Sequence, residues 1–283
     1  MNNSLVASEW TFSTATPGRL ESRYIAGMPP SPTGCLLVGS ILLPDNETVF
    51  RECIARLPHR LKRIPDGETG NRSYFTAFQF AVFSSLPQCM APFAMNKAAE
   101  AKHIDQAEIE KNISKLRNLT INTGYDDAAI SSYATFKRLK DEGAIPKHVR
   151  FQVCLPTGAS VVIALHHQYR KAGFQVYEAA LFRAMRRIQD VIPAGQLSVQ
   201  IDLAVDTAFW EGVYEVPWFD DVREGTLRYI LQMIEQVDEG VELGLHNCYG
   251  ELGCLALCRL LPTSGSFFCL LFLLLLCWLA LTC

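Results

Sequence analysis

The chain has 283 residues, with 26 Lys and Arg against 29 Asp and Glu and a formal net charge of −3. This balance argues against a nucleic-acid binder that works through a basic face. Hydrophobic residues make up 49% of the chain and charged residues 19%, which excludes a disordered protein. The length allows one or two domains, and a single α/β barrel can occupy all of it.

The cysteines and the first residues indicate a compartment. There are ten cysteines in the 283 residues, a density too low for a small secreted domain held together by disulfides. The opening MNNSLVASEWTFSTATPGRL has no basic region followed by an apolar core, so no secretory signal is predicted. We therefore expect a reducing, cytoplasmic location.

The elements are expected in a regular order along the chain. Residues 1–34 are polar and rich in Ser, Thr and Pro, which predicts an N-terminal arm. In the body, residues 35–253, apolar runs typical of buried strands alternate with amphipathic stretches typical of helices. Strands are expected at 36–43, 61–68, 149–156, 197–205 and 241–249. Helices are expected at 47–57, 98–119, 125–140, 175–191 and 218–237.

The β-α order predicts a parallel sheet, and at this length a (β/α)8 TIM-type barrel is the leading fold class. A doubly wound sheet is the alternative, although no glycine-rich nucleotide-binding motif follows a strand. Only five strands precede residue 250, and the 33 residues from 251 to 283 are too few for three more units. The expected barrel is therefore incomplete, with about five of eight βα units.

Function in such a barrel is built at the carboxyl ends of the strands. The first expected strand ends at Gly39 and Ser40. Their backbone amides could bind a carboxylate, and the alternative is that they form a simple bend of the strand. The second ends in Asp66-Gly67-Glu68, either a pair of site carboxylates or a turn.

The later strands end in further candidate groups. Asp202 closes a strand buried on both faces, where a carboxylate is costly unless it is paired or binds a cation. His246 and Cys248 form an H-x-C pattern that puts both side chains on one face. Imidazole and thiolate suit zinc, but two ligands do not complete a site.

Two other features are interpreted as structural. Cys154, at the end of the third expected strand, is assigned to the core. His166 and His167 are neighbours on an expected helix, where their side chains point about 100° apart and do not chelate one metal.

Taken together, the segments VGS, DGE, QID and HNCY resemble the catalytic barrel of cobalamin-independent methionine synthase. The likeness covers roughly residues 36–250 and is greatest to the methionine-synthase-like proteins common in fungi. The wider superfamily also holds uroporphyrinogen decarboxylase. Enzymes of this family transfer a methyl group from a folate to the thiol of homocysteine, with zinc binding the thiol.

The resemblance implies roles for individual residues. It implies contacts with an amino-acid substrate for Gly39, Ser40, Glu68 and Asp202, and it makes His246 and Cys248 the first two zinc ligands. The chain also departs from the family. Asp66 replaces a His, Leu203-Ala204 replaces Glu-Pro, and the remaining zinc ligands, a Glu and a Cys, fall on strands beyond this chain. A folate-binding half is not recognisable, so ancestry is better supported than activity.

The last segment, residues 254–283, has a different composition. It contains 15 consecutive apolar residues at 267–281, which span about 22 Å as a helix and fall short of a ~30 Å hydrocarbon core. One interpretation is an apolar C-terminal helix that associates with a membrane through residues 266–282. The others are an altered reading frame that replaces the later strands, and a buried core helix.

Three functional hypotheses follow. The first is a zinc-dependent methyltransferase acting on a small amino-acid-like or specialised-metabolite substrate, with a folate donor. The second is a non-catalytic, tail-anchored membrane protein that keeps part of the fold. The third is a decarboxylase or lyase on the same superfamily fold.

Overall fold

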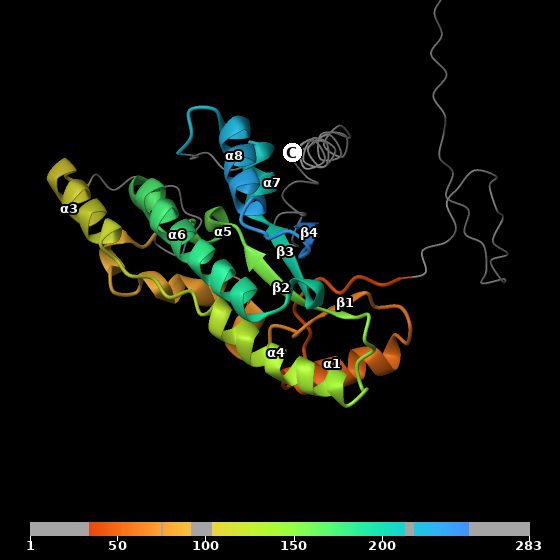
Figure 1. Ribbon diagram of the computed structural model, residues 1–283. Coiled ribbons are helices and arrows are strands. Elements are labelled where there is room, and N and C mark those ends of the chain that lie inside the picture. Colours follow the sequence, from red (N-terminus) through yellow and green to blue (C-terminus); the bar gives the residue numbers. More distant parts are fainter. Residues whose placement is uncertain (1–33, 75, 92–103, 213–217, 249–283) are drawn as a thin grey trace, which may run out of the picture. The chain divides into compact units, whose positions relative to one another are not determined.

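Four parallel strands form the centre of the fold in the computed structural model, which describes residues 34–74, 76–91, 104–212 and 218–248 (Figure 1). They pair in the order β1-β2-β3-β4. Their bounds are Arg63–Pro65 for β1, Arg150–Pro156 for β2, Leu197–Leu203 for β3 and Glu242–Asn247 for β4.

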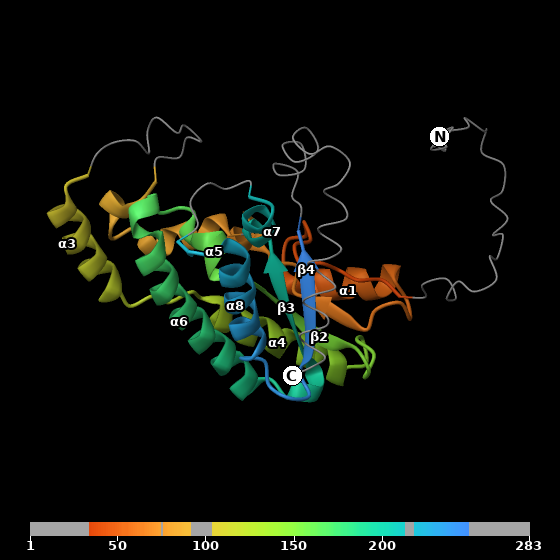
Figure 2. The ribbon, with the colours of Figure 1, turned by 90° about the horizontal axis from the view of Figure 1, so that it is seen from above.

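Helices separate the strands along the chain. The longer ones are α1 Asn46–Arg56, α3 Gln106–Arg117, α4 Tyr125–Asp141, α6 His167–Val191 and α8 Val222–Ile234. Two short helices, α5 Gly158–Val162 and α7 Val205–Trp210, follow β2 and β3 directly. Short 3₁₀ helices occur at Gly70–Tyr74, Ala77–Phe83, Pro87–Cys89 and Ala194–Gln196. Figure 2 shows α7 at the carboxyl end of β3.

One face of the sheet is apolar and packs against helices. Alternate residues of β2 and β3 point to it, among them Phe151, Leu155 and Ile201, which are at most 1% exposed. Phe151 lies 5.4 Å from Phe136 of α4 and 6.2 Å from Phe50 of α1, measured between ring centroids. These aromatic contacts hold α1 and α4 over the sheet.

The later part of the expected order is confirmed. Strands at 149–156, 197–205 and 241–249 appear as β2, β3 and β4, each one to three residues shorter than expected. The expected helices all have counterparts, although α6 begins eight residues earlier than expected, at His167. The described residues thus form an α/β fold with a parallel sheet, as predicted.

The first expected strand, at 36–43, is wrong. This segment pairs with the sheet only through an isolated bridge from Cys35 to Leu61. The carbonyls of Leu37 and Val38 accept hydrogen bonds from side chains of the sheet, so they do not take part in a ladder. Leu42 is 92% exposed, which an inner strand of a covered sheet does not allow.

The second expected strand, at 61–68, is shortened to the three residues of β1. Pro65 has no N–H to give to a ladder, and Gly67 and Glu68 both have positive φ. Within the described ranges the sheet has β1 and β4 as its edges and is not closed.

The expected arm at 1–34 lies outside the described residues apart from Gly34, as does the apolar segment at 254–283. The cytoplasmic location and the alternative of a tail anchor therefore stay predictions from the sequence. Among the residues that the structure describes, no helix combines the length and the apolar character that crossing a bilayer requires.

A buried carboxylate joins the ends of β2 and β3 to α8. Asp206 is 0% exposed and accepts hydrogen bonds from Thr157 Oγ1 at 3.1 Å and Tyr229 Oη at 2.5 Å. Burial raises the pKa of Asp206 to about 6, and the hydroxyl hydrogen bonds oppose that rise. The two donors satisfy a group that is expensive to bury alone.

We predict that Tyr229→Phe lowers the free energy of unfolding by about 1–3 kcal/mol, because a buried carboxylate loses a donor. The same substitution at Tyr74, which is 73% exposed, is the control and should change it by less than ~0.5 kcal/mol. Urea unfolding of both variants measures the difference. Equal effects at the two positions would contradict the role given to the Tyr229 hydroxyl.

Candidate functional site

The second face of the sheet, here called the inner face, is polar. Period-two alternation points the even-numbered residues of β2, β3 and β4 to it. They are Arg150, Gln152, Cys154, Pro156, Ser198, Gln200, Asp202, Glu242, Gly244 and His246. Most of these side chains are buried, so the inner face gathers hydrogen-bonding and titratable groups inside the fold.

Residues 37–40 cross this inner face and are held there by side chains of the sheet. Gln200 Nε2 donates to the carbonyl of Val38 at 2.5 Å, and Gln152 Nε2 donates to the carbonyl of Leu37 at 2.9 Å. Cys154 Sγ donates to the same Val38 oxygen at 3.1 Å. These bonds bring the segment after Val38 to the carboxyl ends of the strands.

Gly39 and Ser40 then meet Glu68. Ser40 Oγ donates a hydrogen bond to Glu68 Oε2. A Cβ placed on Gly39 would lie 3.2 Å from Glu68 Oε2 and 3.4 Å from Cys154 Sγ, so a larger residue would crowd both groups. At Gly39 the backbone therefore approaches both side chains closely. The structure thus brings three of the predicted substrate-contacting residues together.

The turn at Asp66–Gly67–Glu68 directs the Glu68 side chain. Gly67 and Glu68 have φ values of +80° and +49°, and the second is uncommon for a residue with a side chain. Asp66 holds the turn, because its carboxylate accepts from Glu68 N at 3.0 Å, from Ser132 Oγ at 2.7 Å and from Arg72 Nη2 at 2.6 Å. Asp66 therefore supports Glu68, and its own oxygens are occupied.

Asp202 and His246 form the second part of the site. His246 Nδ1 lies 2.9 Å from Asp202 Oδ1, which also accepts from Gln200 Nε2 at 2.8 Å. Asp202 is 4% exposed, and burial raises its pKa above the usual value, against the lowering effect of His246 and Gln200. Residues 202 and 246 are direct partners in the β3–β4 register.

The two parts meet at Cys154. Ligand atoms of Glu68, Cys154 and Asp202 all lie within 4.8 Å of one another. Burial, together with the nearby Asp202 and Asp66, raises the pKa of Glu68 to about 7, while the Ser40 hydrogen bond opposes it. Burial and the two carboxylates also raise the pKa of the Cys154 thiol well above its usual value. The site therefore concentrates acidic groups where water is scarce.

The predicted zinc pair is only partly placed in this site. His246 faces Asp202, whereas Cys248 follows β4 and bonds through its backbone N–H to Leu203 O at 2.9 Å. In the part of the chain that is described, Glu68, Cys154 and Asp202 are the one group of three potential metal ligands, and it contains neither His246 nor Cys248.

The histidine pair interpreted as structural begins α6. His166 is the residue before the helix, and its Nδ1 accepts a hydrogen bond from Gln168 N at 3.4 Å. The helix therefore begins at His167, and His166 serves as its N-cap.

Sequence reasoning missed three residues of the inner face. The core position predicted for Cys154 is confirmed by its burial, but its closeness to Glu68 and Asp202 is not contained in that prediction, and Gln152 and Gln200 are not singled out from the sequence. A signal was present, because Gln152-x-Cys154 and Gln200-x-Asp202 each place two polar groups on one face of a strand that is otherwise apolar.

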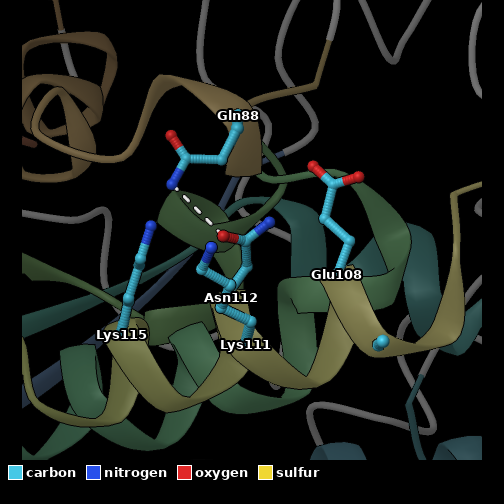
Figure 3. A pocket seen from close by; sticks show the side chains of 6 residues that line it. Gln88, Glu108, Lys111, Asn112 and Lys115 are labelled. Carbon is cyan, nitrogen blue, oxygen red and sulfur yellow. Dashed lines mark hydrogen bonds between the residues drawn. The ribbon is translucent and has the colours of Figure 1, made fainter.

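A surface hollow lies along α3, apart from the inner face (Figure 3). Glu108, Lys111 and Lys115 line it, and Gln88 Nε2 donates across it to Asn112 Oδ1 at 3.3 Å. Its lining comes from one helix and a neighbouring turn, whereas the inner face brings together side chains from several strands.

Comparison with protein-family models, curated proteins and solved structures finds no match to this chain. The functional argument therefore depends on the residues and their geometry.

We predict that Gly67→Ala lowers the free energy of unfolding by about 2 kcal/mol or more. The added Cβ would lie 2.6 Å from Val49 Cγ2, in a residue whose φ is already +80°. Gly70→Ala is the matched control, because Gly70 has φ +70° and nothing within 4 Å, so only a backbone cost of about 1 kcal/mol is expected. Chemical denaturation of the two variants measures the gap, and a Gly70→Ala cost as large as that of Gly67→Ala would refute the close packing of the turn.

Proposed function

We propose that this chain is a methionine-synthase-like methyltransferase. It would bind a small amino-acid-like substrate at the carboxyl ends of its strands and transfer a methyl group, from a folate donor, to a thiol or related nucleophile of that substrate. The proposal includes the barrel ancestry that the sequence resemblance implies, with β1 to β4 as part of an incomplete (β/α)8 barrel.

The observation that carries the proposal is the meeting of Ser40–Glu68 with Asp202–His246. These residues come from four separate regions of the chain, and hydrogen bonds join each pair. Function at the carboxyl ends of parallel strands is the rule for α/β barrels. Ser40, Glu68, Asp202 and His246 each belong to a segment whose resemblance suggested the family.

The carboxylates of Asp202 and Glu68 can bind the amine of a substrate in such a site. The ammonium group of an amino acid is a compact cation, and Asp202 offers it a carboxylate that is fixed by Gln200 and His246. Glu68 offers a second carboxylate, oriented by Ser40 and by the strained turn. Such fixed donors and acceptors select an orientation of the substrate before reaction.

The family's zinc site does not fit the described residues. His246 and Cys248 supply two ligands, and His246 Nδ1 already lies against Asp202. The described residues add no third ligand close to both of them.

A second candidate function, a decarboxylase or lyase on the same fold, is favoured by one observation. A carboxyl group whose pKa is raised to about 7, as that of Glu68 is, can donate and accept a proton at neutral pH. This reaction class needs such a group and does not need Cys248. Product analysis separates it from methyl transfer, because one releases a fragment of the substrate and the other adds a methyl group.

Binding of L-homocysteine to the full-length chain, followed by calorimetry, tests the proposal. We expect Asp202→Asn to weaken binding about tenfold or more, since a charged hydrogen bond is lost. Asp141→Asn, at a surface position paired with Lys137, should leave binding unchanged. The absence of binding by the unaltered chain, with no methyl transfer from a folate donor, would overturn the proposal.

The same binding should depend on pH through Glu68. Because its pKa is raised to about 7, Glu68 is mostly neutral at about pH 6 and mostly ionised at about pH 8, so a cationic amine should bind more tightly at the higher pH. We expect Glu68→Gln to flatten this profile, with Glu142→Gln on the surface as control. A Glu68→Gln profile that kept the full slope would assign the titration to another group.

A further inference from the structure

Three potential metal ligands converge at the inner face, where His246 pairs with Asp202. Ligand atoms of Glu68, Cys154 and Asp202 lie within 4.8 Å of one another. Within the described ranges, neither carboxylate has a salt bridge to Lys or Arg, because the nearby Arg72 binds Asp66. Buried carboxylates are normally paired with a cation or coordinate a metal.

Each carboxylate is held by one oxygen and presents the other. Ser40 Oγ donates to Glu68 Oε2, and both Gln200 Nε2 and His246 Nδ1 contact Asp202 Oδ1. In the part of the chain that is described, Glu68 Oε1 and Asp202 Oδ2 accept no hydrogen bond. Metal-binding carboxylates are characteristically fixed in this way by a second layer of hydrogen bonds.

The surroundings of Cys154 supply an independent indication of a missing ligand. Gln152 Nε2 lies 3.3 Å from Cys154 Sγ and also donates to the carbonyl of Leu37 at 2.9 Å. Gln152 Oε1 is buried and has no hydrogen-bond partner, although Gln152 is only 1% exposed. An unsatisfied buried carbonyl is costly, and a water molecule on an ion bound near Cys154 would satisfy it.

We propose that Glu68, Cys154 and Asp202 bind a divalent cation of the zinc type, with the fourth position left for water or substrate. One thiolate and two carboxylates from three separate strand ends are a ligand set that zinc accepts, and three protein ligands with an open position are typical of catalytic sites. On binding, the thiol proton leaves to solvent and the sulfur bonds to the metal. His246 orients Asp202 and does not bind the ion itself.

This inference rests on the proposed function and changes it at one point, because Glu68 and Asp202 would then hold the ion and the substrate would bind at the open position of that ion. Metal binding is nevertheless measured without substrate or donor. A chain that binds the ion through Cys154 but neither binds L-homocysteine nor transfers a methyl group would refute the proposed function and leave the metal site standing.

Titration of the metal-free full-length chain with Co²⁺ tests the site. A cobalt–thiolate bond gives a sulfur-to-metal charge-transfer band in the near ultraviolet, which we expect to saturate at about one equivalent. Cys154→Ser should abolish the band, and Glu68→Gln should weaken the affinity about tenfold or more. Cys248→Ser is the matched control and should keep both the band and the affinity.

The outcomes separate the two ligand sets. Loss of the band in Cys248→Ser with retention in Cys154→Ser would overturn the proposal in favour of the pair expected from the sequence. No saturable band in the unaltered chain would also overturn it. Thermal unfolding of each metal-free variant identifies a folding defect. If Cys154→Ser does not fold, Glu68→Gln provides the affinity test, because Glu68 is half-buried and is not part of the apolar core.

Discussion

The hydrogen bonds from the side chains of Gln152 and Gln200 to the backbone of residues 37 and 38 are the constraint on which the site depends. They fix a segment across the inner face of the sheet and satisfy backbone carbonyls that no neighbouring strand serves. Gly39 and Ser40 follow directly, so the same bonds set the distance between Ser40 and Glu68. Without them, Cys154 Sγ would be the one sheet side chain in the described residues that still bonds to the backbone of this segment, and the candidate site would lose its hold on Ser40.

Burying polar and acidic side chains on the inner face costs stability, and this cost indicates that the side chains serve a function. Two carboxylates and a thiol share a small buried region, and burial raises the pKa of each of them. A fold selected for stability alone would fill this face with apolar side chains, as it does on the opposite face with Phe151 and Ile201. Perturbed acidic groups held by specific hydrogen bonds are typical of binding and catalytic sites.

The sequence predicts those elements whose position depends on a local pattern of apolar residues alone. Apolar runs and helical periodicity located β2, β3 and β4, because burial on both faces leaves a clear pattern. The segment 36–43 looked the same by composition, but its placement depends on glutamines more than 100 residues away, which no local pattern contains. Asp202 could be predicted from the cost of a buried charge. Cys154 could not be, since a lone cysteine in an apolar run is usually core, and only the fold shows that it lies between two carboxylates.

The convergence of residues 37–40 with the inner face is the central claim, and disulfide trapping tests it most directly. The Cβ of a residue at position 39 would lie 3.4 Å from Cys154 Sγ, which is within reach of a disulfide. Mild oxidation of Gly39→Cys should therefore yield a peptide that links positions 39 and 154, whereas Leu42→Cys, at a position 92% exposed, should give none with Cys154. The account would be contradicted if the thiol introduced at position 39 stayed free. It would also be contradicted if a thiol at position 42 formed a disulfide with Cys154 as readily as one at position 39.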